Sequence, residues 1–186
     1  MTGDYATERE GLFHKRSTTF YLMAAAMGLL LFISVLKGVF FLGLLLAMNV
    51  ALSLLMRPFK LLYIGAEVNI LSAVLAGLAY GAVTGAIFGG ISMLVNFIFM
   101  RRLSMWTLLM LPGDMLVGLI APSFSGMGMA AIGVWMTLVY NLFVSLPIAL
   151  VFRGNISKCF IFGITNVVFN FCLFSTLGEA LKAMMV

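Results

Sequence analysis

Residues 63–97 read YIGAEVNILSAVLAGLAYGAVTGAIFGGISMLVNF, and this stretch decides the fold of the chain. It is long enough to cross a bilayer twice, because one crossing takes about 20 apolar residues. Small residues recur at every fourth position, a spacing that keeps them on one helical face. Small side chains let helix backbones approach closely inside lipid, so the stretch predicts a tightly packed membrane hairpin. The members of this small-residue ladder are Ala73, Gly77, Gly81, Gly85 and Gly89.

The composition extends this interpretation to the whole chain. Of its 186 residues, 63% are hydrophobic and 9% are charged, whereas a soluble domain carries about 25% charged residues. The alternating ten-residue strands of an outer-membrane barrel are absent from the sequence. We therefore expect an all-α polytopic bundle in the plasma membrane. A water-exposed tail over 1–18 precedes a single transmembrane helical domain over 19–186.

Seven apolar segments predict about seven helices. The breaks between them carry charge, proline or glycine, as in RPFK at 57–60, where Pro58 cannot continue a helix. If all seven segments cross, nine basic residues lie on one side and two on the other. The positive-inside rule then places the nine, and the N-terminus, in the cytoplasm. The expected segments are 19–36, 39–56, 62–79, 81–100, 105–121, 127–151 and 157–181.

Three acids fall inside these segments, where charges are costly and usually functional, and the third, Glu179 near the end of the last segment, is expected to lie at the membrane interface. Glu67 lies about one turn into the third segment. It is either a contact for a ligand or ion, or a helix-start acid favoured by the helix dipole and paired with Arg57 or Lys60. Asp114 follows Pro112 and a glycine, a pair that predicts a broken or re-entrant helix. The alternative for Asp114 is an N-cap after that break.

Asparagines form a second set of polar residues within the segments. Asn166 and Asn170 are four residues apart and therefore share one helical face. Hydrogen bonds between helices explain such residues, and so does the lining of a polar cavity. Both interpretations stay open, and they also apply to Asn49, Asn69, Asn96 and Asn141.

The sequence contains no motif that indicates catalysis or a metal site. His14 is the single histidine, and no cluster has the spacing of metal ligands or of a catalytic triad. We therefore expect no enzymatic activity, no metal and no cofactor. We also expect no nucleic-acid partner, because the net charge of +5 comes from loops and the tail. Cys159 and Cys172, about 20 Å apart if on one helix, are expected to be free, buried thiols.

From about residue 40 onward the chain resembles the substrate-binding S components of energy-coupling factor (ECF) transporters. The resemblance rests on FLGLLLAMNVALSLL at 41–55, on the glycine-rich stretch at 69–97, and on GITNVVFNFCLFSTLGEAL at 163–181. It implies a six-helix core that binds a micronutrient-type small molecule and takes its energy from a transmembrane coupling subunit and ATPases. Partner docking is implied for the first helix, through the small-residue stripe Gly43, Ala47 and Ala51.

The chain departs from the family in two ways. An extra helix over 19–36 precedes the matching region, and the basic loops that face outward in the family lie on the cytoplasmic side of the nine-to-two division. These loops either anchor to anionic lipid or form an outward rim for a small anionic or zwitterionic substrate. The candidate rim consists of Arg57, Lys60, Glu67, Arg101, Arg102, Trp106, Asn141, Arg153 and Asn155.

Two other functions remain open for the sequence. The first is a structural or assembly subunit of a membrane complex, similar to the rod-shape family, in which the small-residue faces serve only packing. The second is a self-contained small channel or carrier, which inverted repeats would support. The complete set of candidate binding residues is Glu67, Asp114, Asn141, Arg57, Lys60, Arg101, Arg102, Trp106, Asn166 and Asn170.

Overall fold

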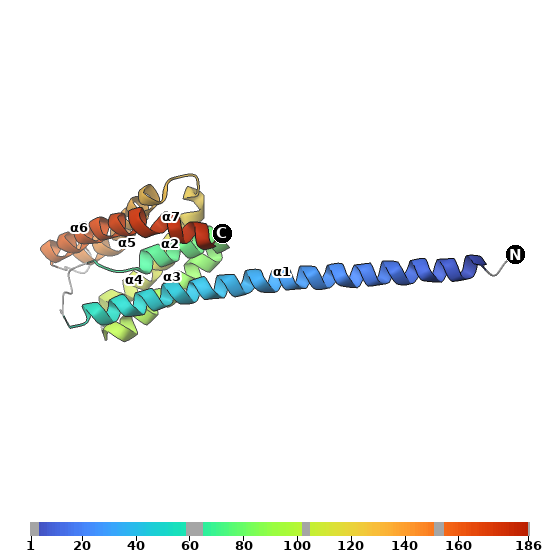
Figure 1. Cartoon of the computed structure of the whole chain (residues 1–186). Coiled ribbons are helices and arrows are strands. Elements are labelled where there is room, and N and C mark those ends of the chain that lie inside the picture. The colour runs from blue at the N-terminus through green and yellow to red at the C-terminus, as the bar shows by residue number, and fades with distance from the viewer. Residues whose placement is uncertain (1–3, 59–64, 102–104, 151–154, 186) are drawn as a thin grey trace. The chain divides into compact units, whose positions relative to one another are not determined.

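The structure, a computed structural model, is helical throughout and contains no strand in the residues that it describes (Figure 1). This confirms the all-α fold. The chain divides into two compact units, Met1–Phe40 and Phe41–Val186, which we describe separately. The described residues are 4–58, 65–101, 105–150 and 155–185, without the side chains of 4–19, 22 and 105–107.

Seven α-helices and two short helical turns follow one another along the described chain. The 3-10 turn η1 follows α4, and the π-helical turn η2 joins α6 to α7. The last expected segment, 157–181, thus corresponds to α6, η2 and α7 together. The bounds are α1 Asp4–Met56, α2 Asn69–Tyr80, α3 Ala82–Met100, α4 Met105–Ile120, η1 Ala121–Phe124, α5 Met129–Leu150, α6 Ile156–Leu173, η2 Phe174–Gly178 and α7 Glu179–Met185.

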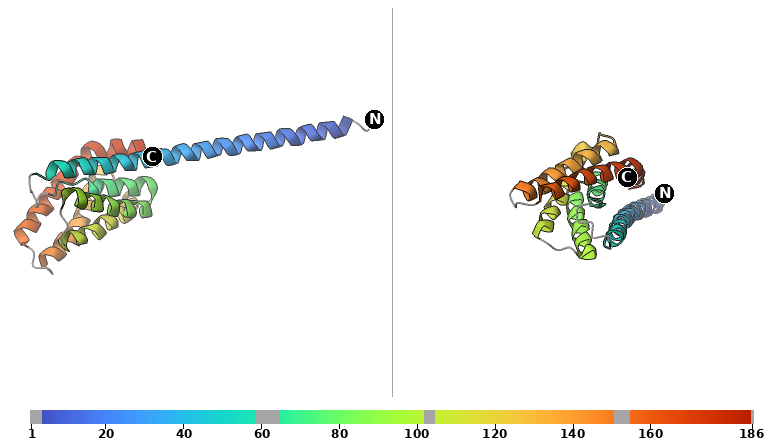
Figure 2. Two further views of the ribbon diagram at one scale, coloured as in Figure 1. Left: turned by 90° about the horizontal axis from the view of Figure 1, so that it is seen from below. Right: turned by 90° about the vertical axis from the view of Figure 1, so that its left-hand side faces the viewer.

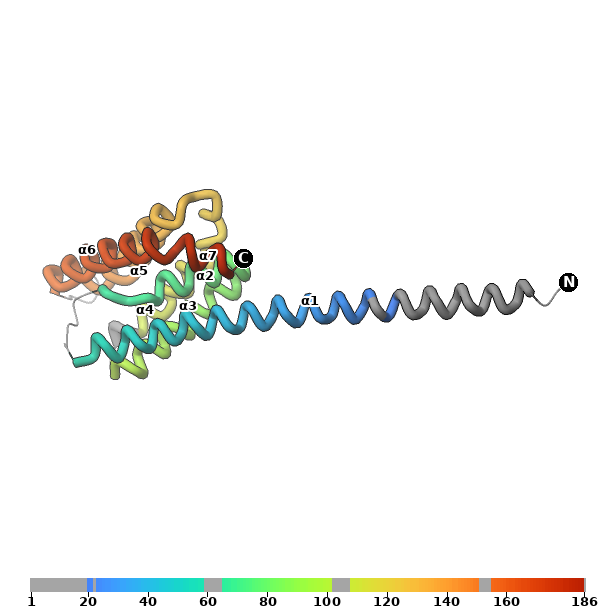
Figure 3. Tube along the Cα trace, in the orientation of Figure 1, coloured from blue at the N-terminus to red at the C-terminus, as the bar shows by residue number. Residues whose placement is uncertain are grey.

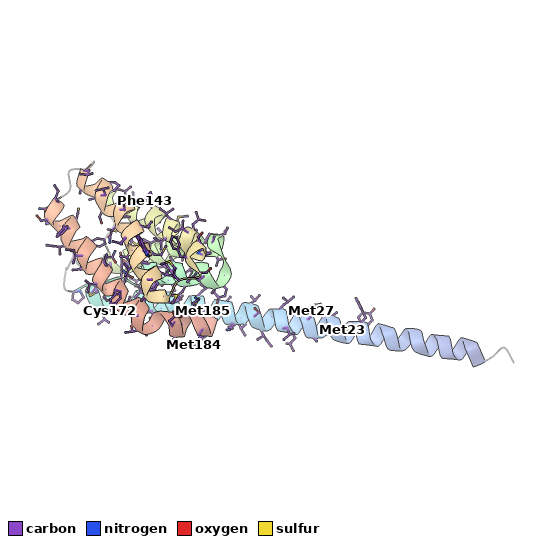
Figure 4. All side chains as sticks on the ribbon, turned by 90° about the horizontal axis from the view of Figure 1, so that it is seen from above. Met23, Met27, Phe143, Cys172, Met184 and Met185 are labelled. Carbon is purple, nitrogen blue, oxygen red and sulfur yellow. The ribbon has the colours of Figure 1, made fainter. Side chains whose placement is uncertain are left out.

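Helix α1 corrects the expected division between the first two segments. It continues without a break through Lys37 and Gly38, and residues 4–18 of the expected tail are helical as well. A lysine and a glycine weaken a helix by only about 1 kcal/mol, far less than a proline does, so they need not end it. Within the first unit, Met23 and Met27 project from α1 with most of their surface exposed, as Figure 4 shows.

Four helical stretches are long and apolar enough to cross a membrane by length and composition. They are Met23–Met56, Ala82–Met100, Met129–Leu150 and Ile156–Met185. Helix α2, with 12 residues, is about 18 Å long and is too short to cross alone. The described chain is therefore that of a membrane protein, whereas the count of seven crossings is not confirmed.

Helix α2 forms the centre of the second unit. Each of its residues from Asn69 to Gly77 is buried, and it packs against α3, α4, α5, α6 and α7. The two views of Figure 2 place α2 between the α3–α4 pair and the α5–α6 pair. An element that is buried all round can be apolar all round, which explains why α2 carries no polar face toward lipid or water.

The small-residue ladder folds back on itself at Gly81. This glycine has φ = 94°, a conformation that other residues rarely adopt, and it ends α2 and begins α3. The hairpin, visible in Figure 3, brings Gly77 of α2 against Gly85 of α3. A Cβ built on Gly85 would lie 2.6 Å from the Cα of Gly77 and 2.5 Å from the carbonyl oxygen of Gly118. The predicted close packing is confirmed, and α4 joins it as a third helix.

Helix α4 corrects the expected break before Asp114. Pro112 lies inside the continuous helix, so Asp114 is not an N-cap. Neighbouring helices can compensate for the hydrogen bond that an intramembrane proline removes. Close packing surrounds this point, because a Cβ on Gly113 would lie 2.6 Å from a methyl group of Val144 and 3.1 Å from the ring of Tyr140.

The part of α1 that belongs to the second unit packs through one polar face. Leu45, Asn49 and Ser53, spaced four apart, are buried. The Asn49 side chain donates to the carbonyl oxygen of Ser92 at 2.7 Å and accepts from the Asn96 amide at 3.3 Å. The implied docking stripe Gly43, Ala47 and Ala51 lies on another side of α1 and is exposed within the described chain.

The two cysteines are free, as expected, but they are not both buried. Cys159 is half-buried, and Cys172 is exposed on α6, where Figure 4 labels it. The error arises because sequence periodicity within an almost wholly apolar helix does not distinguish the lipid-facing side from the core side.

Glu179 caps the start of α5 from a distant part of the chain. Its carboxylate accepts a hydrogen bond of 3.0 Å from the backbone N–H of Met129, the first residue of α5. We expect Glu179→Ala to lower the free energy of unfolding by about 1 kcal/mol, the usual cost of a lost N-cap. Thermal unfolding in detergent measures the loss. Glu179→Gln keeps an oxygen acceptor at this position and is the control, so an equal loss in both variants would contradict the capping role.

Candidate functional site

The chain enters α2 through a short non-helical segment, residues 65–68, that lies against α6. The Gly65 N–H donates to the Thr165 hydroxyl at 3.0 Å. A Cβ on Gly65 would lie 2.5 Å from the Cβ of Asn166 and 2.9 Å from its Cα, so only glycine permits this approach. Irregular backbone at membrane depth is tolerated only where protein buries it or where it lines a cavity. Here protein buries it, and Glu67 is carried into the interior.

Glu67 is only 8% exposed and lies just before the N-terminal end of α2. Its Oε2 accepts a hydrogen bond of 3.2 Å from the Asn69 side chain, which also approaches the sulfur of Met93 at 3.0 Å. The expected pairing with Arg57 is not found, because Arg57 is exposed at the end of α1. The helix-dipole part of the interpretation fits this position, since the N-terminus of α2 favours negative charge.

Asp114 and Tyr140 complete a buried group of oxygen-bearing side chains around Glu67. Asp114 comes from α4 and Tyr140 from α5, and both are 0% exposed. The Tyr140 phenol lies close to the Glu67 carboxyl group, and Asp114 interacts electrostatically with both residues. We call Glu67, Asn69, Asp114 and Tyr140 the oxygen cluster.

Most oxygen atoms of the cluster make no hydrogen bond of good geometry in the described part of the chain. These atoms are Glu67 Oε1, Asn69 Oδ1, both carboxylate oxygens of Asp114 and the Tyr140 hydroxyl. Buried polar atoms are almost always satisfied in folded proteins, and an unsatisfied one costs about 1–3 kcal/mol. The Tyr140 hydroxyl lies within hydrogen-bonding reach of the Glu67 carboxyl group, so the atoms that these side chains leave without any partner are Asn69 Oδ1 and both carboxylate oxygens of Asp114. These three atoms mark a site that something else completes.

The depth of the cluster follows from its contact with α3. Met93, which touches Asn69, precedes the last residue of α3, Met100, by seven positions. Seven residues of α-helix correspond to roughly 10 Å. The cluster therefore lies inside the bundle, well within the length of a membrane-crossing helix.

The asparagines of α5 and α6 form a separate chain of hydrogen bonds. Asn141 accepts from the Asn166 amide and from the Ser145 hydroxyl, each at 3.5 Å, and the Asn170 amide donates to the Asn166 side chain. This pattern matches the interpretation that the asparagines join helices. One buried acceptor, Asn170 Oδ1, has no partner among the described residues.

The expected basic rim is only partly described. Arg57 and Arg101 are exposed, and Arg101 ends α3 in a left-handed conformation with φ = 53°. Asn155 is exposed and caps α6 by accepting from the Lys158 N–H. The structure thus brings Glu67 and Asp114 together but does not join them to Arg57 or Arg101. Lys60, Arg102, Arg153 and the Trp106 side chain lie outside the described part of the chain.

A groove of about 540 Å³ lies elsewhere, between α5 and α6. Its walls are almost entirely apolar, with Leu138, Leu142, Phe160 and Val168 among them, and several of these side chains are exposed. An apolar groove on membrane-crossing helices is suited to lipid chains and does not satisfy the oxygen cluster.

Sequence reasoning missed Tyr140 and named Asn69 only as one of the asparagines that join helices or line a polar cavity. A tyrosine next to Asn141 on an apolar helix carries no distinguishing signal, because aromatic residues are common in membrane helices. Asn69 follows Glu67 by two positions, and this spacing in a non-helical entry segment was a usable sign of contact.

The fold and this site define an all-helical membrane protein with a buried, oxygen-rich polar centre. Comparison with protein-family models, curated proteins and solved structures finds no match to the chain.

Proposed function

We propose that the chain is the substrate-binding subunit of a membrane uptake system for a small, micronutrient-type molecule. The observation that carries the proposal is the oxygen cluster beside a non-helical segment, in which Asn69 Oδ1 and both Asp114 carboxylate oxygens have no partner among the described residues. A protein gains nothing in stability from orphaned buried oxygens, whereas a binding site needs them. Polar residues inside a membrane bundle commonly mark a substrate or ion site.

The continuous α1 supports the comparison with ECF S components. With α1 counted as one crossing, followed by residues 65–80 (the non-helical entry segment together with α2), α3, α4 with η1, α5 and the α6–α7 region, the proposed topology has six crossings. The basic connections after α1, α3 and α5 then lie on the side opposite the N-terminus, rather than on the same side as in the nine-to-two division. This arrangement agrees with the six-helix topology that the resemblance implies and leaves a cytoplasmic N-terminus and an outward ligand entrance.

The surface of α1 supports an association with partner subunits. The apolar stretch Met23–Met56 has 34 residues, or about 51 Å of helix, whereas a bilayer core is about 30 Å thick. One crossing therefore leaves apolar turns that lipid alone does not cover. The exposed stripe Gly43, Ala47 and Ala51 offers a coupling subunit close backbone approach. In this proposal, the ATPases belong to the partner complex.

Purification from native membranes tests the proposal. We expect a transmembrane subunit and ATPases to co-purify, and mass spectrometry of the denatured sample to detect a released small molecule. Asp114→Asn and Glu67→Gln should reduce the bound molecule about 30-fold or more, because removing one charge from a buried polar contact costs at least about 2 kcal/mol. Glu179→Gln removes an acid outside the cluster and should retain the molecule.

The alternative, a structural or assembly subunit, predicts a different result. In that case no small molecule is released. Asp114→Asn and Glu67→Gln then either weaken the association of the chain with the other subunits of its complex or have no measurable effect. A preparation without ligand and without transmembrane or ATPase partners would contradict the uptake proposal.

A further inference from the structure

We infer that the oxygen cluster binds a positively charged group, either a hard metal cation or the ammonium group of an organic substrate. The inference names the chemical class of the ligand that the oxygen cluster binds. It rests on the proposed function only where it treats this ligand as part of the transported substrate or as a coupling ion. The binding itself follows from the charges and unpartnered atoms of the site.

The first argument is charge. Glu67 and Asp114 bring two carboxyl groups together in the interior, and the described groups that act on them are Asn69, Tyr140 and each other. Burying charge without a partner is expensive, and two like charges add repulsion. A bound cation would remove both costs.

The second argument is the kind of atom presented. Asn69 uses both donors of its amide, one toward Glu67 and one toward Met93, so its oxygen remains free to accept. Both Asp114 oxygens are free in the same way, and the Tyr140 hydroxyl oxygen keeps a lone pair beside the Glu67 carboxyl group. Carboxylate, amide and hydroxyl oxygens are the ligands of hard cations and the acceptors for an ammonium group. An anion would find one donor in the cluster, the Tyr140 O–H, and would be repelled by both carboxylates.

The third argument excludes softer metals within the described part of the chain. It contains no group of three or more histidine, cysteine, aspartate or glutamate residues placed to hold a metal ion. The cluster itself presents oxygen atoms from two carboxylates, one amide and one phenol, with no histidine or cysteine among its members. Such a set suits hard cations rather than zinc or copper, which favour nitrogen and thiolate ligands. Of the two expected substrate classes, anionic and zwitterionic, only a zwitterionic substrate carries a positive group that could enter the cluster.

Thermal unfolding of the purified full chain in detergent tests the inference. The reference salt is choline chloride, because its bulky quaternary cation has no N–H group to donate to the cluster oxygens. It is replaced at constant ionic strength by sodium, calcium or methylammonium chloride. We expect at least one of these to raise the unfolding temperature by roughly 5–10 °C at about 100 times its dissociation constant. A response to sodium or calcium identifies a free metal cation as the source, and a response to methylammonium alone identifies the ammonium group of a substrate.

Matched variants separate binding from folding. Asp114→Asn keeps the shape of the side chain and removes one buried charge, so in choline it should unfold at no lower temperature than the native chain. It should lose the cation-dependent rise, whereas Glu179→Gln should keep it. Tyr140→Phe removes one ligand and should require a higher cation concentration for the same rise.

Two results would overturn the inference. One is an unfolding temperature that is the same in all four salts, which means that protons alone neutralise the cluster. The other is an equal rise in the native chain and in Asp114→Asn. Because the measurement uses the isolated chain, it does not depend on co-purified partners, and the uptake proposal and the cation inference can fail separately.

Discussion

Gly118→Ala is expected to disrupt the bundle and to lower the free energy of unfolding by at least about 3 kcal/mol. A Cβ on Gly118 would meet the backbone carbonyl of Gly85 closer than real Cβ atoms approach, and would lie 2.8 Å from the N of Ala86. Both contacts are with backbone, which cannot move aside as a flexible side chain can. The added methyl group must therefore separate α3 from α4.

Size-exclusion chromatography and thermal unfolding in detergent measure this effect. Gly43→Ala is the matched control, because a Cβ on Gly43 meets nothing within 4 Å in the structure. This control should match the native chain or slightly exceed it, since alanine favours a helix more than glycine does. Equal behaviour of the two variants would refute the close contact of α3 and α4 at Gly118.

Gly65→Ala should have the second-largest effect, a loss of roughly 2–3 kcal/mol in the free energy of unfolding. The new methyl group would overlap the Cβ and Cα of Asn166 on α6. The segment that carries Glu67 would then shift away from α6 and displace one carboxylate of the oxygen cluster. The variant should therefore unfold at a lower temperature and also lose most of the cation-dependent stabilisation.

Gly163→Ala on α6 is the control for Gly65→Ala. A Cβ on Gly163 has a single neighbour, the Asn141 Cγ at 4.0 Å, which is ordinary contact. This variant should fold normally and respond to cation as the native chain does. If Gly65→Ala also retains the full response, the close approach of the entry segment to α6 does not position the cluster.

Much of the packing was predictable from the sequence. Four-residue spacing of Gly77, Gly81 and Gly85 in an apolar stretch indicates close backbone approach, and the structure places Gly77 against Gly85. The pattern did not predict that the third partner is Gly118, because that glycine lies on another helix with no local signal. Spacing describes one helical face, whereas the partner of that face depends on how the helices assemble.

The candidate site was predictable only in part. Glu67 and Asp114 stood out because acids are rare in apolar segments, and the structure brings them together. Tyr140 was not singled out, and Asn69 was named only among the asparagines within the segments, since neither residue is distinctive until packing buries it. The break expected before Asp114 and the break between the first two segments were wrong, because local breakers were overridden inside continuous helices.

Composition determined that this chain is a membrane protein, and the absence of alternating ten-residue strands left helices as the arrangement that satisfies the backbone in lipid. Small-residue spacing determined that the 63–97 stretch forms a close hairpin. Only the tertiary structure decided that α2 is the buried centre of the second unit and that carboxylates 47 positions apart in sequence, Glu67 and Asp114, share one oxygen cluster. Local sequence patterns determine which helical faces carry apolar or small residues. Packing between helices that are distant in sequence determines which polar side chains are buried together in one site.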